Sequence, residues 1–318
     1  MDKFLNDLKM EKAELQYILG KCFLLGFQVK SDTKKGVYCL KQAAKSGNVK
    51  SMLALRDYYK RSEEKEDARR AFYWCRRAAN KYDVGAIFEL GYYYSEGIGT
   101  DQDMGKAYLL YRQAASYGNV GALNNIGHCY EKGFSLCRLP IKKDERKAAY
   151  YYKRAYDKGE LRAGANLARC YEKGIGVEQN DERAFEYYHE IANRGFVEGY
   201  NNLGKKYYEG RGVAQDYEKA LYWWQGAARS GNCHALYNIG FMYEFGFGVE
   251  QSYEQAFRMY YEAAETGYAL SYLKLGYLLE EDKVNIVEYM EELSYLLEAD
   301  ETDFLEYISI LDKGIIQS

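Results

Sequence analysis

The sequence predicts an all-α solenoid built from repeated pairs of helices. Three observations carry this prediction. An aliphatic residue followed by glycine returns along most of the chain at a nearly constant interval. Gly-x-Gly pairs follow several copies of that phrase, and a helix-capping residue, aromatic pairs and a closing glycine come after them. A fixed period in this range is typical of repeat proteins in which each unit packs only against its neighbours.

The repeated phrase sets the length of the unit. Its copies are Leu19-Gly20, Leu90-Gly91, Ile126-Gly127, Leu203-Gly204, Ile239-Gly240 and Leu275-Gly276, with Leu55-Arg56 and Leu167-Ala168 as degenerate copies. Successive copies lie 36, 35, 36, 41, 36, 36 and 36 residues apart. Glycine inside a helix costs about 1 kcal/mol relative to alanine. Its return at one site therefore predicts a place where a neighbouring backbone comes close.

Each unit is predicted to hold two helices, which we name helix A and helix B. In the copy at 198–233, Gly199, Leu203 and Tyr207 are four residues apart and share one face of helix A. Helix B is predicted to begin at a column of preferred N-caps: Asp32, Asp67, Asp103, Asp144, Asn180, Asp216 and Ser252. Glycine closes helix B at the position of a left-handed cap in six copies, and Tyr82 replaces it in the second copy. Aromatic residues facing small ones assign most of the 36 tyrosines to packing.

These columns together resemble a known repeat. The order Ala-x-x-x-Leu-Gly-x-x-Tyr-x-x-Gly-x-Gly-Val, then Asp-x-x-x-Ala, aromatics, Ala-Ala and Gly, is similar to the Sel-1-like repeat, a relative of the tetratricopeptide repeat. The match divides the chain into an N-terminal cap at 1–12, about seven repeats at 13–280 and acidic C-terminal capping helices at 281–318. The resemblance implies a right-handed α/α superhelix and an adaptor or scaffold role in protein complexes. One branch of the family carries a cysteine pair in each repeat. Ala115 and Ala122 stand at such positions, so the chain lies outside that branch.

Composition narrows the setting and the partners. The net charge is −3, so the chain has no excess of positive charge to attract nucleic acid, and we expect no nucleic-acid partner. Charges such as Asp2, Lys3 and Asp7 interrupt the apolar core that a signal peptide needs, and the longest uncharged run, 113–130, is too polar for a membrane helix. We expect a cytoplasmic protein, unless a leader precedes residue 1. Most of the seven cysteines fit small hydrophobic positions in a reduced compartment. The oligomeric state stays open.

Two columns of helix A are the candidate binding residues, by analogy with tetratricopeptide arrays whose helix A lines the concave side. The column before the aliphatic residue holds Asn125, Asn166, Asn202 and Asn238. This ladder is able to bond an extended peptide backbone, or it bonds within the array. The column two residues after the aliphatic residue includes Tyr92, His128, Arg169, Lys205 and Phe241. Its cationic centre suits a carboxylate or acidic segment. The alternative is a set of solvated charges paired with Glu131, Glu172 and Glu209.

Two segments depart from the repeat. Residues 134–143 replace the short turn of the fourth copy and contain the single proline of the chain. Insertions in solenoids often carry function, so Cys137 and Arg138 are possible contacts at this edge, although a neutral loop extension fits equally well. Residues 280–306 hold eleven acidic residues and one lysine. A polar-backed terminal helix covers the last face of a solenoid. The other interpretation is an acidic helix that engages a partner or the chain's own cationic groove.

Catalysis and metal binding find little support. The Gly-x-Gly pairs lie between predicted helices, without the strand that a nucleotide fingerprint needs. Glu186 and His189 form half of a metal motif with no second half nearby. Neighbouring residues such as His128 and Cys129 point about 100° apart on a helix, so they do not make a nucleophile and base pair. We expect no enzyme activity, no metal and no cofactor.

The sequence therefore favours an interaction module that binds a protein segment in the groove of repeats three to six. A second hypothesis is an inhibitor or immunity-type protein that wraps one folded enzyme and uses residues 134–143. A third, a hydrolase-class enzyme, would lose its activity on substitution of Cys129 or His128. In the first hypothesis, a rigid array presents amide, cationic and aromatic groups at fixed spacing, so little entropy is lost in the receptor.

Overall fold

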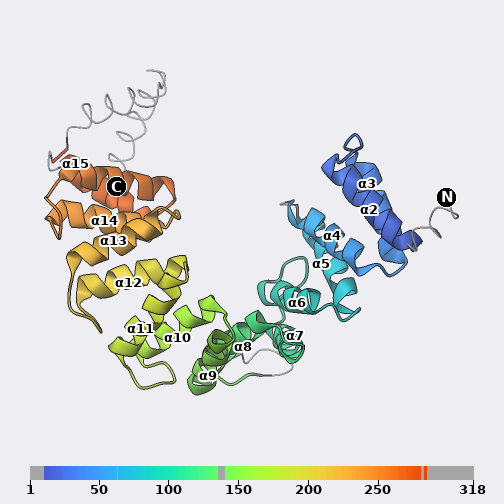
Figure 1. Cartoon of the computed structure of the whole chain (residues 1–318), viewed down its shortest axis with the longest axis horizontal. Helices are drawn as coiled ribbons and strands as arrows, with labels where there is room; N and C mark the ends of the chain where they lie inside the picture. The colour runs from blue at the N-terminus through green and yellow to red at the C-terminus, as the bar shows by residue number, and fades with distance from the viewer. Residues whose placement is uncertain (1–10, 63, 135–139, 281–282, 285–318) are drawn as a thin grey trace. The chain divides into compact units, whose positions relative to one another are not determined.

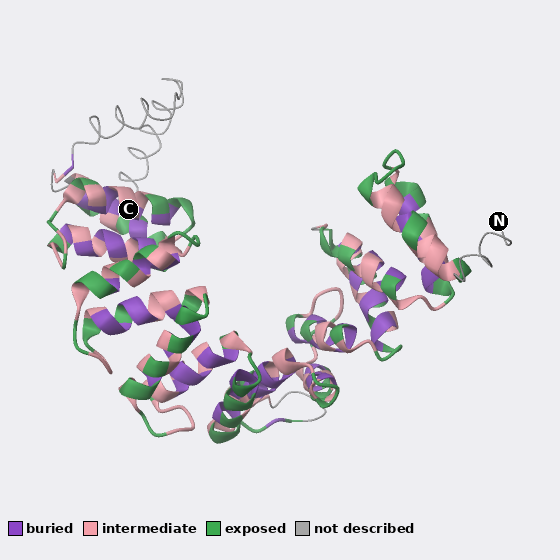
Figure 2. Cartoon of the chain, viewed as in Figure 1, coloured by how far each residue is buried: buried purple, intermediate pink, exposed green. Residues whose placement is uncertain are grey.

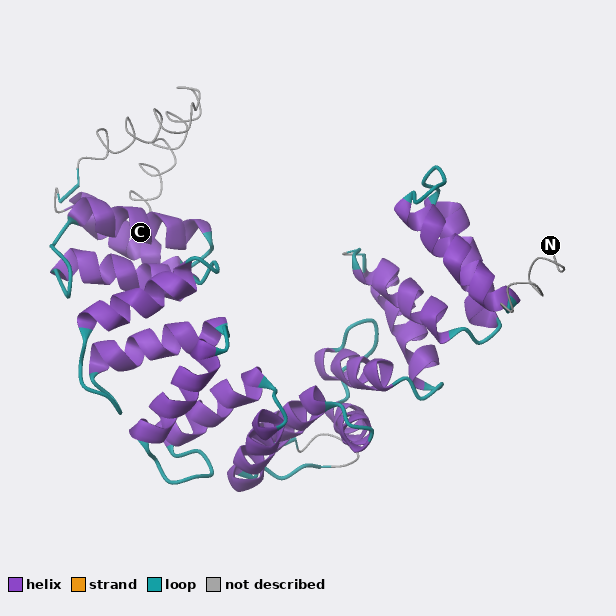
Figure 3. Cartoon of the chain, in the orientation of Figure 1, coloured by secondary structure: helices purple, strands orange, loops and turns teal. Residues whose placement is uncertain are grey.

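The computed structural model describes residues 11–62, 64–134, 140–280 and 283–284. These residues form fifteen α-helices and no strand beyond one isolated bridge between Phe134 and Ile141 (Figure 3). From α2 to α9 and from α11 to α16, each helix packs against the next one in the chain, and the two helices of one repeat share the most extensive contacts. The predicted all-α solenoid of helix pairs is confirmed.

Helices A and B alternate along the chain (Figure 1). The A helices are α2 (Lys12–Leu25), α4 (Val49–Lys60), α6 (Val84–Glu96), α8 (Val120–Lys132), α10 (Leu161–Lys173), α12 (Val197–Glu209), α14 (Cys233–Phe245) and α16 (Ala269–Glu280). The B helices are α3 (Thr33–Lys45), α5 (Lys65–Ala79), α7 (Met104–Ser116), α9 (Glu145–Asp157), α11 (Asp181–Asn193), α13 (Tyr217–Ala228) and α15 (Tyr253–Glu265). The last described A helix, α16, has no B helix among the described residues.

The contacts divide the chain into two compact units. The first comprises Met1–Ala163 with Ile175–Val177, and the second comprises Gly164–Gly174 with Glu178–Ser318. In each unit the buried side chains occupy the faces that neighbouring helices turn toward one another (Figure 2). Nearly all of the predicted terminal caps at 1–12 and 281–318 lies outside the described residues, so those boundaries stay predictions.

The glycine of the repeated phrase lies flat against a side chain of helix B. A Cβ added at Gly127 would lie 2.8 Å from ring atoms of Tyr152 and 3.2 Å from the Ala148 carbonyl oxygen. The same contact recurs at Gly91 with Tyr111 (2.7 Å), Gly204 with Trp224 (2.6 Å) and Gly240 with Tyr260 (2.9 Å). The neighbour that excludes a side chain is therefore the ring first and the backbone second. The recurrence of glycine by itself predicted only the contact with the backbone.

Four buried tyrosines of helix B have their hydroxyl groups hydrogen-bonded to helix A. The Tyr152 hydroxyl donates to Glu131 Oε2 at 2.6 Å. The same hydrogen bond joins Tyr111 to Ser95 (3.2 Å), Tyr188 to Glu172 (3.4 Å) and Tyr260 to Glu244 (2.5 Å). Burial is the main cause that raises the pKa of Tyr111, to about 12. Each ring therefore fills the interior of the repeat while its polar end stays satisfied.

The second repeat exchanges the sizes of the two partners. Arg56 replaces the glycine of helix A, and Cys75 replaces the large side chain that faces it. The small thiol leaves room for the guanidinium group, whose charge is met by Asp57 at 2.7 Å and Glu89 at 2.6 Å. Burial raises the pKa of the Cys75 thiol to about 12, so this cysteine is a packing residue. The degenerate phrase Leu55-Arg56 thus keeps the volume of the contact while changing its chemistry.

The second glycine of each Gly-x-Gly turn fixes the spacing between repeats. Gly212 has φ +76°, and a Cβ placed there would lie 2.1 Å from the carbonyl oxygen of Asp181 at the start of the preceding helix B. The corresponding approach is 2.3 Å from Gly99 to the Ala68 oxygen and 1.9 Å from Gly176 to the Glu145 oxygen. No side chain fits at these positions, so one repeat rests directly on the backbone of the previous one.

Six of the seven predicted N-caps of helix B are confirmed by hydrogen bonds from the backbone N–H three residues later. The prediction for Asp67 is wrong. Helix α5 begins at Lys65 after Glu64, and Asp67 instead bonds Arg70 at 2.8 Å. The loop before α5 is short and lacks the two glycines, so the chain enters the helix earlier. At the other end of α5, Tyr82 takes the left-handed φ of +61° that glycine supplies elsewhere.

Two glycines of one column make a matched test of the ring contact. Gly240→Ala places a methyl group against Tyr260, and we expect a loss of about 1–3 kcal/mol in the free energy of unfolding. Among the described residues, Gly276 has no neighbour within 4 Å of an added Cβ. Gly276→Ala should therefore raise the same free energy by up to about 1 kcal/mol through helix propensity. Urea unfolding of both variants is the measurement, and equal effects would contradict the assigned contact.

The capping aspartates predict how stability depends on pH. Hydrogen bonds from backbone N–H groups lower the pKa of Asp103, Asp144 and Asp216. A lowered pKa in the folded state gives stability that is complete well above the unfolded value of about 3.9 and is lost as pH falls through the folded pKa. We expect the thermal midpoint to fall between about pH 5 and pH 2. The triple variant with asparagine at these sites should show a shallower decline, and an identical decline would contradict this origin.

Candidate functional site

A polar groove of about 640 Å³ lies between α10 and α12 in the second unit. Its lining residues include four of the predicted site residues, Asn166, Arg169, Asn202 and Lys205. The other lining residues are Ala165, Glu172, Lys173, Gln179, Tyr188, Glu198 and Arg211. The structure therefore brings the asparagine and cationic columns of two successive repeats together on one surface.

The repeat itself explains why these side chains meet. Asn202 and Lys205 are three residues apart on α12, which places them on one helix face. Asn166 and Arg169 hold the same two positions of the repeat on α10. Because α10 and α12 are the A helices of consecutive repeats, these equivalent positions line the same groove.

The groove carries more positive than negative charge. Arg169, Lys173, Lys205 and Arg211 line it, against Glu172 and Glu198. The pair of Lys205 with Glu209 is long, at 3.7 Å, and the Lys205 side chain is 52 % exposed. An exposed ion pair of this kind contributes little, so Lys205 is available to a ligand. The predicted pairing with Glu209 is therefore present but weak.

A buried lysine lies next to the groove and neutralises its acidic side. The Lys206 side chain is 1 % exposed, and its Nζ lies 2.9 Å from Glu172 Oε1 and 2.8 Å from Asp181 Oδ1. Arg211 adds a second cation at 3.2 Å from Asp181. Burial alone would raise the pKa of Asp181, but the hydrogen bonds and charges of Lys206 and Arg211 outweigh it and lower that pKa. Asp181 thus stays ionised and paired, and Glu172 shares the same lysine.

Sequence reasoning missed the role of Lys206. Lys206 stands in a column of helix A that also holds Tyr93, Cys129, Cys170 and Met242. A lysine in a column of buried residues is the signal that was available, because a buried lysine needs a nearby carboxylate. The identity of these carboxylates becomes visible only in the folded structure, where α12 packs on α11.

The asparagine column is partly engaged within the protein. Asn202 Nδ2 donates to the carbonyl oxygen of Glu198 at 2.8 Å, and Asn125 shares a hydrogen bond with Tyr111. An asparagine side chain has two donor hydrogens and an acceptor oxygen, so one bond leaves capacity for a ligand. Both of the alternatives for this column thus have a structural basis.

The remaining predicted residues lie in other places. Tyr92, Asn125 and His128 belong to the first unit, where Tyr92 and His128 are exposed and Asn125 is half-buried. Asn238 and Phe241 lie on α14 in the second unit. Cys137 and Arg138 lie outside the described residues.

Aromatic side chains form a second surface beside the groove. The Phe241 ring lies 4.6 Å from Phe245, 6.1 Å from Phe247 and 6.3 Å from Tyr208, measured between ring centroids. Tyr208 follows Lys205 by one helical turn on α12. We name Tyr208, Phe241, Phe245 and Phe247 the aromatic surface. It continues the groove surface toward the next repeat, since Phe241 occupies the position of Arg169 and Lys205.

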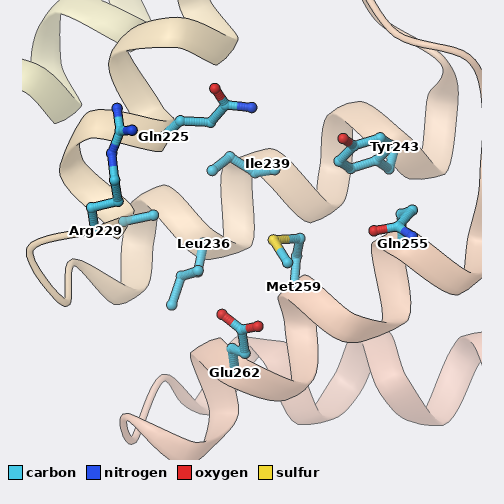
Figure 4. Close-up of a pocket in the computed structure, with 9 residues that line it drawn as sticks. Gln225, Arg229, Leu236, Ile239, Tyr243, Gln255, Met259 and Glu262 are labelled. Atoms are coloured by element: carbon cyan, nitrogen blue, oxygen red, sulfur yellow. The ribbon is translucent and has the colours of Figure 1, made fainter. Parts of the chain in front are cut away.

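A different cavity, of about 420 Å³, lies between α13, α14 and α15. Figure 4 shows Leu236, Ile239 and Met259 in its middle, with the polar ends of Gln225, Arg229, Gln255 and Glu262 around them. A similar cavity of about 370 Å³ lies between α3, α4 and α5. Its recurrence between successive B helices marks it as a product of repeat packing. It is therefore a weaker candidate than the groove.

The described residues hold no metal-binding cluster. No group of three or more His, Cys, Asp or Glu side chains among them is placed to hold a metal ion. Burial raises the pKa of the Cys129 thiol to about 12, which disfavours a nucleophilic thiolate. No helix of this part of the chain is long and apolar enough to span a bilayer.

Adjacent lysines on α12 give a matched test of the buried network. Lys206→Met leaves Glu172 and Asp181 without their shared cation, and we expect a loss of about 3 kcal/mol in the free energy of unfolding. Lys205→Met removes an exposed charge and should change it by less than about 0.5 kcal/mol. Urea denaturation measures both. Equal small effects would show that Lys206 contributes no more than a surface lysine.

Comparison with known proteins agrees with this architecture. The chain is 26 % identical to a Sel1 repeat protein of Oxalobacter formigenes, with a TM-score of 0.67, over 96 % of this chain and 89 % of that one. It is 25 % identical to a protective antigen of uropathogenic Escherichia coli, with a TM-score of 0.68, over 87 % of this chain. It is also 33 % identical over 112 residues to the chitin synthase regulator SKT5 of Saccharomyces cerevisiae.

Two of these matches cover only part of the relative. The aligned region spans 58 % of the antigen and 16 % of SKT5. The model of the Sel1 repeat matches residues 13–48, 52–83, 84–119, 120–160, 162–196, 197–232 and 233–268. These seven matches cover most of the chain and coincide with the helix pairs described above. The chain belongs to the Sel1 repeat family.

Proposed function

We propose that this chain is a protein–protein interaction module that binds an acidic segment of a partner protein in the groove between α10 and α12. Proteins of the Sel1 repeat family generally mediate protein–protein interactions. The observation that carries the proposal is the convergence of Arg169, Lys173, Lys205 and Arg211 on one groove. A partner's carboxylate would enter a site where positive charge already exceeds negative charge.

The chemistry of the groove suits an extended acidic segment. An arginine such as Arg169 is able to hold a carboxylate through two parallel hydrogen bonds, which gives direction as well as charge. The amides of Asn166 and Asn202 offer donors and acceptors to a peptide backbone. Because helix packing fixes these side chains before binding, the receptor loses little entropy when the segment docks.

The buried network makes this charge balance possible. Without Lys206, the carboxylates of Glu172 and Asp181 would oppose an incoming carboxylate from the side of the groove. With Lys206 in place, Glu172 already has a cationic partner, so its charge opposes an incoming carboxylate less. The groove is therefore proposed to recognise negative charge, and the predicted acidic partner is retained.

Other assignments from the sequence remain predictions. The inhibitor hypothesis depends on residues 134–143, half of which lie outside the described residues. The cytoplasmic location, the lack of a nucleic-acid partner and the absence of catalysis also stay predictions. The proposal uses only the second unit and so does not depend on any of them.

Capture of partners from native lysate tests the groove. Arg169→Glu/Lys205→Glu should reduce capture of the specific partner at least about tenfold, because it places two negative charges opposite the acidic segment. Amine-reactive cross-links of the wild-type complex should reach Lys173, the lysine at the groove that this variant keeps. Quantitative mass spectrometry reads both results.

The matched control changes the same charge elsewhere in the unit. Arg194→Glu/Lys219→Glu alters an arginine and a lysine that are exposed and lie outside the groove lining. It should leave capture unchanged. If the groove variant captures the partner as well as the wild type does, the groove is not the binding site.

A further inference from the structure

We infer that the acidic segment bound by this protein carries an aromatic residue about three positions from its acidic residue. The carboxylate lies in the groove between α10 and α12, and the aromatic side chain lies on the aromatic surface of Tyr208, Phe241, Phe245 and Phe247. This inference rests on the proposed function and names the chemistry of its partner.

The residue type changes at two positions of helix A when the array reaches α14. The last residue of helix A is Glu96, Lys132, Lys173 and Glu209 in α6, α8, α10 and α12, but Phe245 in α14. The position of Arg169 and Lys205 becomes Phe241 in α14. Two positions that are polar in the three preceding repeats are thus both phenylalanine in one helix. Their rings are 4.6 Å apart.

The aromatic surface is accessible to a partner's side chain at Phe245. Phe245 is 48 % exposed, so its ring is not needed to fill the interior of the repeat. The neighbouring core positions Ile239 and Met242 are buried, as expected for helix A. An exposed phenylalanine beside a second one at (i, i+4) provides an apolar area that a partner's side chain is able to cover.

A cationic side chain is excluded as the occupant of the aromatic surface. Lys274 of α16 already lies over this surface, with its Nζ 5.5 Å from the Phe241 ring and 5.3 Å from the Phe245 ring. Glu244, itself buried, holds that Nζ at 2.9 Å with both carboxylate oxygens. A second cation would be repelled, whereas an aromatic side chain adds apolar contact without opposing charge.

The repeat sets the distance between the groove and the aromatic surface, and hence the spacing of the acidic and aromatic residues in the bound segment. Lys205 and Phe241 hold equivalent positions in adjacent repeats, and Tyr208 on α12 touches Phe241 on α14. Tyr208 lies three residues after Lys205 on α12, about 4.5 Å along the helix axis, and its ring centroid lies 6.3 Å from that of Phe241, so the two lengths together span about 11 Å. An extended chain advances about 3.3–3.6 Å per residue, so about three residues connect the two places. The charge of the groove supplies the complementarity for the acidic end of the segment.

The experiment uses the full-length protein and fluorescein-labelled peptides with blocked termini. The acid–aromatic probe is Ser-Asp-Asp-Gly-Ser-Phe-Gly-Ser, and the acid-only probe replaces Phe with Ser. Fluorescence polarisation measures the affinity of each. We expect the acid–aromatic probe to bind the wild type at least about tenfold more tightly, as expected when one aromatic anchor is gained.

Variants assign the difference to the aromatic surface. Phe241→Ser/Phe245→Ser should reduce the difference between probes to less than about twofold. Phe245→Glu gives this position the residue type of Glu209. It should also reduce the difference in affinity between the two probes, and it should disturb the packing least. Tyr150→Ser/Tyr222→Ser removes two exposed tyrosines of B helices and should keep the full difference. Circular dichroism confirms that each variant is folded.

Three results of this binding experiment would each contradict a different part of the proposal. Equal affinity of both probes, with loss of both in Arg169→Glu/Lys205→Glu, leaves the groove in place and refutes the aromatic requirement. Binding that the charge reversal leaves unchanged refutes the proposed function itself. The chain also carries Glu301 and Phe304 three positions apart. A probe difference found only in Glu301→Gln/Phe304→Ser would show that the chain's own segment occupies the surface, which overturns an external partner.

Discussion

The contact between a helix B side chain and a helix A glycine is the constraint on which the rest of this protein depends. At Gly127, Gly204 and Gly240 a ring lies so close that no Cβ fits. The contact brings the two helices of a repeat together at one rotation about their axes. Since that rotation is repeated, residues at equivalent positions of successive A helices face the same side. The proposed binding surface follows from this repetition.

The interior and the surface of the array use charge in different ways. Inside, the acidic residues at the end of helix A accept hydrogen bonds from tyrosine hydroxyls, as Glu131 does from Tyr152. In the second unit Glu172 also meets Lys206, which is buried. That lysine neutralises carboxylates that would otherwise weaken the positive groove. A substitution in a packing column thus changes the chemistry of a surface that it does not itself line.

Much of the architecture was predictable because it depends on local chemistry repeated many times. N-caps such as Asp103, the closing glycines and the helix pairs follow from hydrogen bonding and backbone freedom that the sequence displays directly. Even Tyr82 takes the left-handed conformation of the residue it replaces. Asp67 failed as a cap because its loop is short and lacks the glycines that delay helix entry elsewhere.

Part of the candidate site was predictable and part was not. The columns containing Arg169 and Lys205 are visible in the sequence, and the structure joins them in one groove. The partners of Lys206 were not visible, because Asp181 comes from a different helix of the preceding repeat. Phe245 was also overlooked, since its exposure depends on where α14 ends. Local patterns thus identify positions, whereas pairings across repeats require the packed structure.

Hydrogen exchange of the protein with its captured partner tests the central claim most directly. The account predicts slower exchange of backbone amides near the ends of helices A in the second unit, at 166–173, 202–211 and 238–247. It predicts unchanged exchange in the B helix α13. Protection confined to α13 and the other B helices, with none in these three segments, would contradict a binding surface built from the helix A columns.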